Sequence, residues 1–279
     1  MQVGLMIKPN KIKYTLIIIA ITFSNLTCSD MYNDVWENGS SDKYKLSIIE
    51  TSSTFSNRIL QTDGKGNLSV MYSDTAAANC SSARVADFDN DNNADILFVY
   101  ANGDSRILFS AGEKTCQTFY LPVTSAGRMD AAAADFDNDG DTDIFIAGNT
   151  GDYSYLKNEG NKSFILQNIS VTLSDNNAVR VSAADFNGDG YTDVVIGTSD
   201  TLQFFKNNLK IDGTFIQIEI ATALTTVVDS AMADFDGDGD IDVFLLSNNG
   251  PYSLYINNGS GTFTQKDITS STSSNTSVS

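Results

Sequence analysis

The strongest constraint in the sequence is a nine-residue acidic segment that occurs four times with the pattern Asp-x-[Asp/Asn]-x-Asp-x-x-x-Asp. Consecutive copies begin 48, 50 and 49 residues apart, a regularity that chance does not produce. A fixed period of about fifty residues predicts a repeat architecture, in which each period forms one supersecondary unit. We refer to the acidic segments as loops 1 to 4, which are residues 87–95, 135–143, 185–193 and 234–242.

The residues around the loops repeat as well, and they predict β-strands. Each loop is followed by a short, β-branched apolar run, which indicates a buried strand. An alternating segment and a fourth segment that begins near a phenylalanine complete each period, and no helix is signalled. The apolar runs are residues 96–99, 144–146, 194–196 and 243–246, and the phenylalanines are Phe119, Phe164, Phe215 and Phe263. Four strands in about fifty residues are typical of a propeller blade.

The two ends of the chain predict a fifth blade. Residues 43–49, 58–60 and 67–72 have the pattern of the last three strands of a blade that lacks an acidic loop, and residues 275–279 lie one strand beyond the last complete period. We therefore expect an all-β fold, a β-propeller of about five four-stranded blades closed by the C-terminal strand, which would remove an exposed sheet edge. Two alternatives remain open: the strand pairs with a neighbouring molecule, or the Ser/Thr-rich end is a tail and the ring is open.

The loops have the composition of a calcium site. Side chains at positions 1, 3, 5 and 9 converge when the backbone coils around one point, and the carbonyl at position 7 adds an oxygen. Five or more hard oxygen ligands suit the large, flexible shell of Ca²⁺ better than that of Mg²⁺ or Zn²⁺. Gly140, Gly190 and Gly239 permit a sharp turn at position 6, whereas Asn92 leads us to expect the weakest geometry in loop 1. The alternative is a set of acidic surface turns without metal.

Position 12 distinguishes these loops from EF-hands, which need a bidentate Glu there on a following helix. This position is apolar and lies inside a predicted strand in every copy, as Phe98, Ile146, Ile196 and Leu245. Position 2 is always a phenylalanine that we expect to anchor the loop to the core, as Phe88, Phe136, Phe186 and Phe235. The sequence therefore predicts calcium loops between strands.

On these motifs and their flanks, residues 40 to 270 resemble the FG-GAP (VCBS-type) repeats of integrin α-subunit propellers and of many secreted bacterial proteins. The resemblance implies a β-propeller with calcium in a hairpin loop of each blade, about four Ca²⁺ in all. The literal Phe-Gly and Gly-Ala-Pro sequences are absent, and integrin propellers have seven blades. By this resemblance the side-chain ligands are Asp87, Asp89, Asp91, Asp95, Asp135, Asp137, Asp139, Asp143, Asp185, Asn187, Asp189, Asp193, Asp234, Asp236, Asp238 and Asp242, and the carbonyl ligands are Asn93, Asp141, Tyr191 and Asp240.

The N-terminus predicts export. Lys8, Lys11 and Lys13 precede an apolar run at residues 14–23 that is too short to span a bilayer, which is the pattern of a signal peptide. Cys28 lies where a bacterial lipoprotein carries its lipidated cysteine, so lipidation and ordinary cleavage both remain open. We expect a signal peptide at 1–28, a linker at 29–40 and the propeller at 41–279, in a protein at the cell surface, in the outer envelope or outside the cell.

The other two cysteines, Cys80 and Cys116, form an even pair once Cys28 is lipidated or removed. An oxidising compartment would allow a disulfide between them. The alternative is two buried thiols.

Charge and composition limit the function. The chain has 35 Asp and Glu against 17 Lys and Arg, a net charge of −18, which argues against a nucleic-acid partner. Because histidine is absent, mechanisms that use an imidazole base are excluded, and we expect no enzyme. We expect an adhesion or binding module for a glycan or a protein, with membrane contact only through a lipid anchor. Aromatic candidates for stacking on sugars, each equally a candidate for strand packing, are Tyr100, Tyr153, Tyr191 and Tyr252.

Two other functions remain open. The C-terminal strand favours a self-assembling extracellular or filament subunit that forms by strand exchange. Some polysaccharide lyases and hydrolases also use propellers, although no nucleophile motif stands out in this chain.

Overall fold

The computed structural model describes residues 17–18, 31–33, 47–50, 57–62, 67–74, 80–101, 105–110, 116–123, 127–169, 178–221, 224, 227–247 and 251–270. The chain divides into two compact units, residues 1–83 with 113–115, and residues 84–112 with 116–279. Each unit is described by itself. All of the described elements are strands except the 3-10 turn η1 (Asn149–Gly151) and the one-turn helix α1 (Leu209–Asp212), neither of which has the length or apolar character of a membrane-spanning helix.

The first unit contains one antiparallel sheet with the strand order β1-β2-β3-β4-β5. Its strands are β1 (Ile17–Ile18), β2 (Met31–Asn33), β3 (Ser47–Glu50), β4 (Asn57–Thr62) and β5 (Leu68–Asp74). The three strands predicted for an N-terminal blade are confirmed as β3 to β5. The edge of β3 where the C-terminal strand was expected is occupied by β2, and residues 275–279 lie outside the described residues.

Four further sheets each have four antiparallel strands in sequence order. Their strands are β6 (Cys80–Ala86), β7 (Asp95–Tyr100), β8 (Arg106–Ser110) and β9 (Cys116–Tyr120); β10 (Arg128–Ala134), β11 (Asp143–Gly148), β12 (Tyr153–Asn158) and β13 (Phe164–Ile169); β14 (Ala178–Ala184), β15 (Asp193–Thr198), β16 (Leu202–Asn208) and β17 (Thr214–Ala221); and β18 (Val227–Ala233), β19 (Asp242–Ser247), β20 (Pro251–Asn257) and β21 (Phe263–Ser270). This is the predicted pattern of four strands per period.

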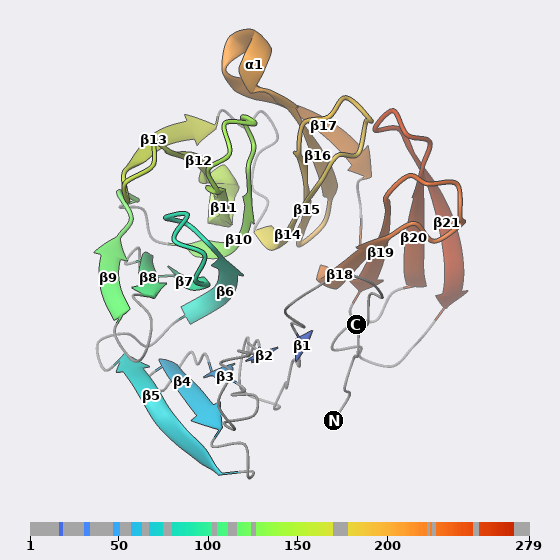
Figure 1. Ribbon diagram of the computed structural model, residues 1–279. Helices are drawn as coiled ribbons and strands as arrows, with labels where there is room; N and C mark the ends of the chain where they lie inside the picture. The colour runs from blue at the N-terminus through green and yellow to red at the C-terminus, as the bar shows by residue number, and fades with distance from the viewer. Residues whose placement is uncertain are drawn as a thin grey trace. The chain divides into compact units, whose positions relative to one another are not determined.

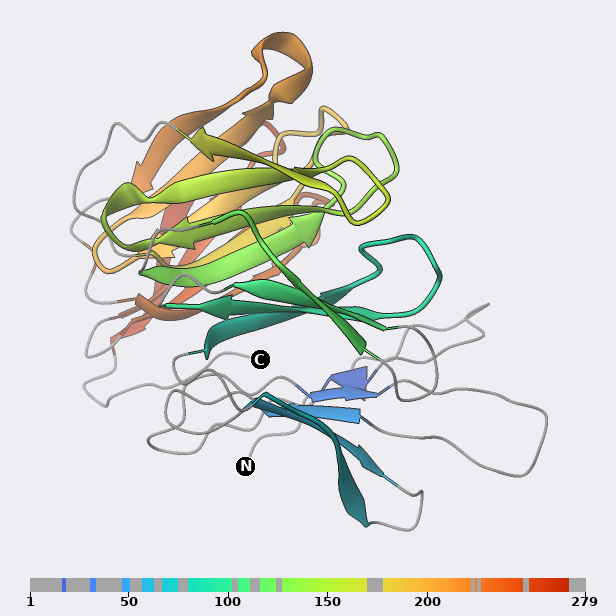
Figure 2. The same cartoon turned by 90° about the vertical axis from the view of Figure 1, so that its left-hand side faces the viewer.

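Within the second unit, the sheets follow one another around a common centre (Figure 1). The first strands of successive sheets are neighbours, with β10 against β14 and β14 against β18, while β13, β17 and β21 lie on the outside. Each acidic loop joins the first strand of its sheet to the second, and Figure 2 shows loops 1 and 2 projecting on the same side of the unit. The fold therefore places the acidic loops at one end of successive blades.

Apolar side chains between neighbouring sheets form the core. Phe145, for example, is fully buried and packs against Phe205 and Phe215 of the next sheet, with ring centroids 5.8 and 5.2 Å apart. Second strands are buried on both faces because a sheet covers each side, which explains their continuous apolar runs. The strand prediction from those runs is confirmed, including the residues at position 12 of each loop.

The structure departs from the sequence-based expectations at one turn. The β16–β17 connection contains the helical turn α1, which was not expected. Gly213 ends it in the left-handed conformation at φ 75°, with its N–H bonded to the carbonyl of Leu209.

The expected disulfide is also absent. Cys80 begins β6 and Cys116 begins β9, the two outermost strands in the order β6-β7-β8-β9, and no disulfide joins them. Neighbouring strands lie about 4.8 Å apart. The distance between β6 and β9, with two strands between them, therefore exceeds the Cα–Cα separation of about 7 Å that a disulfide tolerates. Cys80 is buried and donates from its Sγ to the carbonyl of Ser82, whereas Cys116 is exposed.

The N-terminal predictions stay open. Ile17 and Ile18, inside the predicted signal peptide, pair with β2, and Cys28 lies outside the described residues. The signal peptide, the linker and the lipidation of Cys28 remain predictions.

Candidate metal centre

All four loops share a backbone wrapped around the carboxylate at position 1. Its Oδ2 accepts the N–H of position 6, from Asn92 at 2.8 Å in loop 1 and from Gly140 at 3.0 Å in loop 2. The same contact joins Asp185 to Gly190 at 2.9 Å and Asp234 to Gly239 at 3.0 Å. Position 6 has positive φ throughout, and Asn92 at 65° adopts it as the glycines do. The expected weakness of loop 1 is therefore wrong.

The aspartate at position 9 fastens each loop to its own sheet. Asp143 is fully buried; its Oδ2 accepts the N–H of Phe136 at 3.1 Å, and its Oδ1 accepts the N–H of Asn158 at 2.7 Å. Asp95, Asp193 and Asp242 make the equivalent pairs of bonds. Burial raises the pKa of three of these carboxyl groups to about 6, although the hydrogen bonds that they accept oppose the shift; the three are Asp95, Asp143 and Asp193.

Three loops bring carboxylates from positions 1, 3 and 9 together. In each, one oxygen from every member of the triad lies within 4.8 Å of the others. The triads are Asp87, Asp89 and Asp95; Asp135, Asp137 and Asp143; and Asp234, Asp236 and Asp242. Loop 3 differs because position 3 is Asn187, whose amide donates to Asp193 Oδ2 at 2.7 Å.

The donor set fits a hard divalent cation. Every triad offers oxygen alone, the chemistry that Ca²⁺ and Mg²⁺ prefer. In loop 1, Asp89 Oδ1 is buried and has no hydrogen-bond partner among the described residues. A buried carboxylate oxygen without a partner is costly, and a bound cation would satisfy it.

Other predicted ligands lie in the loops but outside the triads. The position 5 carboxylates are tied to their own backbone, since Oδ1 of each accepts the N–H of position 7 at 2.7 to 3.0 Å. These residues are Asp91, Asp139, Asp189 and Asp238. Their metal role, and that of the carbonyl groups of Asn93, Asp141, Tyr191 and Asp240, stays a prediction.

Lysine ammonium groups contact three of the four loops, which sequence reasoning missed. Lys157 Nζ lies 2.6 Å from Asp137 Oδ2 and 3.1 Å from Asp139 Oδ2, and its hydrogen bonds to these carboxylates, to Asp137 first, raise its pKa. Lys162 Nζ lies 3.0 Å from Asp89 Oδ2, and Lys206 Nζ lies 3.6 Å from Asp189 Oδ2. Lys157 and Lys206 occupy the same position in their repeats, directly before the asparagine near the end of the third strand. This recurrence could have indicated two of the three contacts.

A buried asparagine near the end of each later third strand joins adjacent loops, and sequence reasoning missed this role too. Asn158, Asn207 and Asn257 recur at intervals of 49 and 50 residues, which is the signal that was available. Each donates from Nδ2 to the carbonyl of the position 2 phenylalanine in the preceding loop, at 2.7 to 2.8 Å. The metal loops of successive sheets are thus connected through one side chain.

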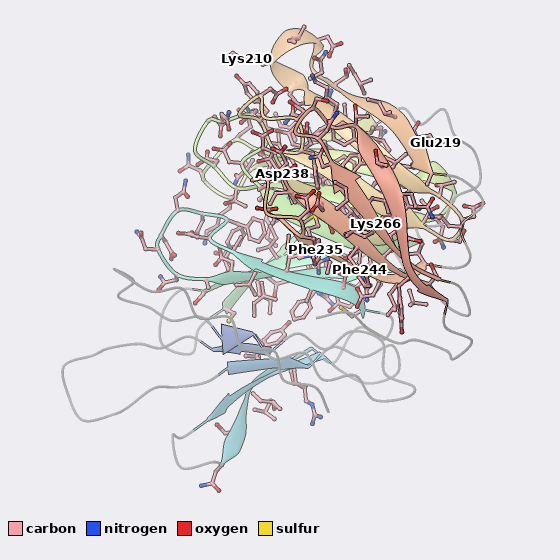
Figure 3. All side chains as sticks on the ribbon, turned by 90° about the vertical axis from the view of Figure 1, so that its right-hand side faces the viewer. Lys210, Glu219, Phe235, Asp238, Phe244 and Lys266 are labelled. Atoms are coloured by element: carbon pink, nitrogen blue, oxygen red, sulfur yellow. The ribbon has the colours of Figure 1, made fainter. Side chains whose placement is uncertain are left out.

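The phenylalanine at position 2 anchors three loops, as predicted, by packing on the outer strand of the next sheet. The pairs are Phe88 with Phe164, Phe136 with Phe215 and Phe186 with Phe263. Phe235 lies beside Phe244 of its own sheet (Figure 3). Its side chain is 46% exposed, because no described residue of a following sheet packs on it. The anchoring prediction is wrong for loop 4.

Two of the four candidate stacking residues are unsuitable for that role. Tyr100 and Tyr153 are buried in the core, with 0% and 1% exposure. Tyr252 is half-buried and stacks on Phe244, and Tyr191 is half-buried in loop 3 with Lys210 Nζ 5.4 Å from its ring centroid. Strand packing therefore explains the first two.

The repeated sheets and acidic loops define a class of repeat propeller with several candidate cation sites. The model of the FG-GAP-like repeat matches residues 135–196, 185–245 and 234–279, which together are more than half of the chain. The chain therefore belongs to the FG-GAP-like repeat family. Among curated proteins, none matches the chain in sequence.

Two solved structures share the fold. A lectin from Agrocybe aegerita, described for its specific recognition of non-reducing terminal N-acetylglucosamine, has a TM-score of 0.54 at 17% identity, covering 94% of this chain and 81% of the lectin. A protein from Lactobacillus plantarum has a TM-score of 0.53 at 13% identity, covering 93% of this chain and 82% of that protein. At these identities the likeness shows the fold alone, and it agrees with the predicted all-β propeller.

Proposed function

We propose that this chain is an exported, calcium-binding propeller that acts as a glycan-binding module. The observation that carries the metal part is the recurrence of three carboxylate triads at equivalent positions. Calcium is favoured over magnesium because Ca²⁺ accepts many oxygen ligands in a flexible geometry, which these oxygen-rich loops can supply, whereas Mg²⁺ requires near-ideal octahedral geometry. In these three loops Ca²⁺ would hold the coiled form by joining three carboxylates that otherwise repel one another.

The glycan part is supported by the likeness to the Agrocybe aegerita lectin, which recognises a terminal N-acetylglucosamine. The acidic net charge disfavours nucleic acid as the alternative ligand. Binding is favoured over catalysis because the chain has no histidine, and many of its carboxylates lie in the loops. Export is supported by the N-terminal sequence pattern.

A glycan array tests this function directly. The chain would be probed with 2 mM CaCl₂ and again with excess EGTA, and calcium binding would be measured separately by calorimetry. The proposal expects calcium uptake and retention of a small set of glycans that falls on chelation. Calcium uptake without any glycan retention would leave the metal assignment and overturn the ligand.

A further inference from the structure

Loops 2 and 4 are related by register but differ in one neighbouring side chain. The third-strand residue whose N–H bonds to Oδ1 of the position 9 aspartate is Asn158 at loop 2 and Asn257 at loop 4. The residue directly before it is Lys157 in the first case and Ile256 in the second. Lys206 precedes Asn207 in the same way. These backbone bonds fix the register, and Ile256 stands at loop 4 where loops 2 and 3 have a lysine. Loop 1 has Phe109 at this position, before Ser110, and its lysine contact comes instead from Lys162 of the neighbouring sheet.

The lysine of loop 2 lies on atoms that a cation would need. Its Nζ contacts Asp137 Oδ2 at 2.6 Å and Asp139 Oδ2 at 3.1 Å, and it lies 3.6 Å from Glu159 Oε1. Asp137 belongs to the loop 2 triad. The ammonium therefore neutralises part of the charge that would attract a cation to this loop.

Among the described residues, no lysine or arginine supplies such a counter-charge to loop 4. Its five aspartates make no ion pair with a described lysine or arginine, and the triad aspartates Asp234 and Asp236 are exposed. Loops 1 and 3 are intermediate, since Lys162 contacts Asp89 from the neighbouring sheet and Lys206 lies 3.6 Å from Asp189. Loops 1, 2 and 4 thus have the same carboxylate triad and different local charge from the lysines, while loop 3 has Asn187 in place of the position 3 aspartate.

We propose that Lys157 is a built-in counter-cation that lowers the metal affinity of loop 2, and that loop 4 is the principal metal site of the chain. This inference rests on the proposed calcium binding. A divalent ion in loop 2 must either displace the ammonium from two carboxylates or bind beside a like charge. No described lysine or arginine imposes either cost on loop 4, so the repeats fill in order rather than together.

Calorimetric titration of CaCl₂ into the full chain, compared with the Lys157→Met variant, tests the proposal. Methionine keeps the length and apolar character of the side chain and removes the charge. We expect loop 2 of the variant to bind Ca²⁺ at least tenfold more tightly than loop 2 of the unmodified chain. A unit charge a few ångströms from a divalent ion changes its affinity by about that factor even in water. Adding Asp137→Asn to the variant should abolish the gain and so map it to loop 2.

Two further variants keep the test decisive. Ile256→Lys, the reciprocal change, should weaken the tightest site by a similar factor, and it remains informative if Lys157→Met does not fold. Lys266→Met removes the same charge from an exposed residue of β21 that forms no ion pair with a described residue, and it should leave each site unchanged.

The outcomes separate this inference from the proposed function. If the unmodified chain takes up no Ca²⁺, the calcium assignment and this inference both fail. If it takes up Ca²⁺ and neither Lys157→Met nor Ile256→Lys changes the affinity in the stated direction, only the graded order is overturned.

Discussion

Asn158 donates a hydrogen bond of 2.8 Å to the carbonyl of Phe88, seventy residues earlier in the chain and in the preceding sheet. The same amide donates to the carbonyl of Thr142 at 3.0 Å, and the backbone N–H of Asn158 bonds to Asp143. Phe88 is in turn held through its N–H by Asp95. A carboxylate of loop 1 and a carboxylate of loop 2 are therefore connected through two residues, and the arrangement repeats at the next two loops.

Replacing Asn158 with alanine should destabilise the fold strongly. The change leaves the buried carbonyl of Phe88 and the half-buried carbonyl of Thr142 without this donor, and an orphaned buried group costs about 1–3 kcal/mol. We expect about 2–4 kcal/mol less free energy of unfolding, with or without calcium, measured by urea denaturation. Asn168→Ala removes the same amide from an exposed position and serves as control. Equal effects of the two substitutions would contradict the role assigned to Asn158.

Replacing Asp236 with asparagine should separate metal binding from stability. The variant removes one oxyanion of the loop 4 triad. Without metal it should raise the unfolding temperature slightly, because three neighbouring carboxylates repel one another less when one is neutral. With calcium it should lower the temperature gain on binding, and titration should show the tightest site weakened by at least tenfold. Glu219→Gln, on the exposed face of β17, should do neither. A gain as large as that of the unmodified chain would rule out loop 4 as a cation site.

The buried position 9 carboxyls predict a pH dependence. In the folded chain without metal, the pKa values of Asp95, Asp143 and Asp193 are raised to about 6, from the value near 4 of the unfolded chain. The folded state then binds more protons between pH 4 and 6. The stability from these groups is therefore fully present below pH 4 and is lost as the pH rises through 6.

Calcium should reverse this trend, because it binds the ionised carboxylates and competes with the protons. The increase in unfolding temperature that calcium produces should grow from pH 5 to pH 7, with its midpoint near pH 6. Scanning fluorimetry with CaCl₂ and with EGTA at each pH measures it. A calcium-induced increase that is constant over this range would show that the three carboxyls do not titrate where their burial places them.

Local sequence was sufficient for the blades and the loops. Each acidic loop is nine residues long, so the contacts that coil it, such as Asp135 to Gly140, join near neighbours in the chain. The second strands were equally predictable, because a strand such as β11 is buried on both faces and so appears in the sequence as a continuous apolar run. These features depend on residues that are close in sequence, and their prediction is confirmed.

Relationships between sheets were not predictable in the same way. The bond from Asn158 to Phe88 and the ion pair of Lys162 with Asp89 depend on how one sheet packs on the next. The disulfide prediction failed for a related reason, since Cys80 and Cys116 are close in sequence but begin strands that two others separate. Periodicity identifies residues that recur, and it does not identify their partners.

The position 2 phenylalanines provide a matched comparison of buried and exposed anchors. Phe136 is fully buried and lies 5.8 Å from Phe215 and 6.1 Å from Tyr155 between ring centroids, whereas Phe235 is 46% exposed. Phe136→Ala should therefore lower the free energy of unfolding by about 3–5 kcal/mol, the usual cost of removing a buried aromatic ring. Phe235→Ala should cost less than half as much, because water already reaches the ring and little cavity forms. Urea denaturation of both variants without metal measures the difference. Similar losses of unfolding free energy in the two variants would mean that a part of the chain or a partner packs on Phe235 in solution. The distinction between the first three anchors and the fourth would then not hold.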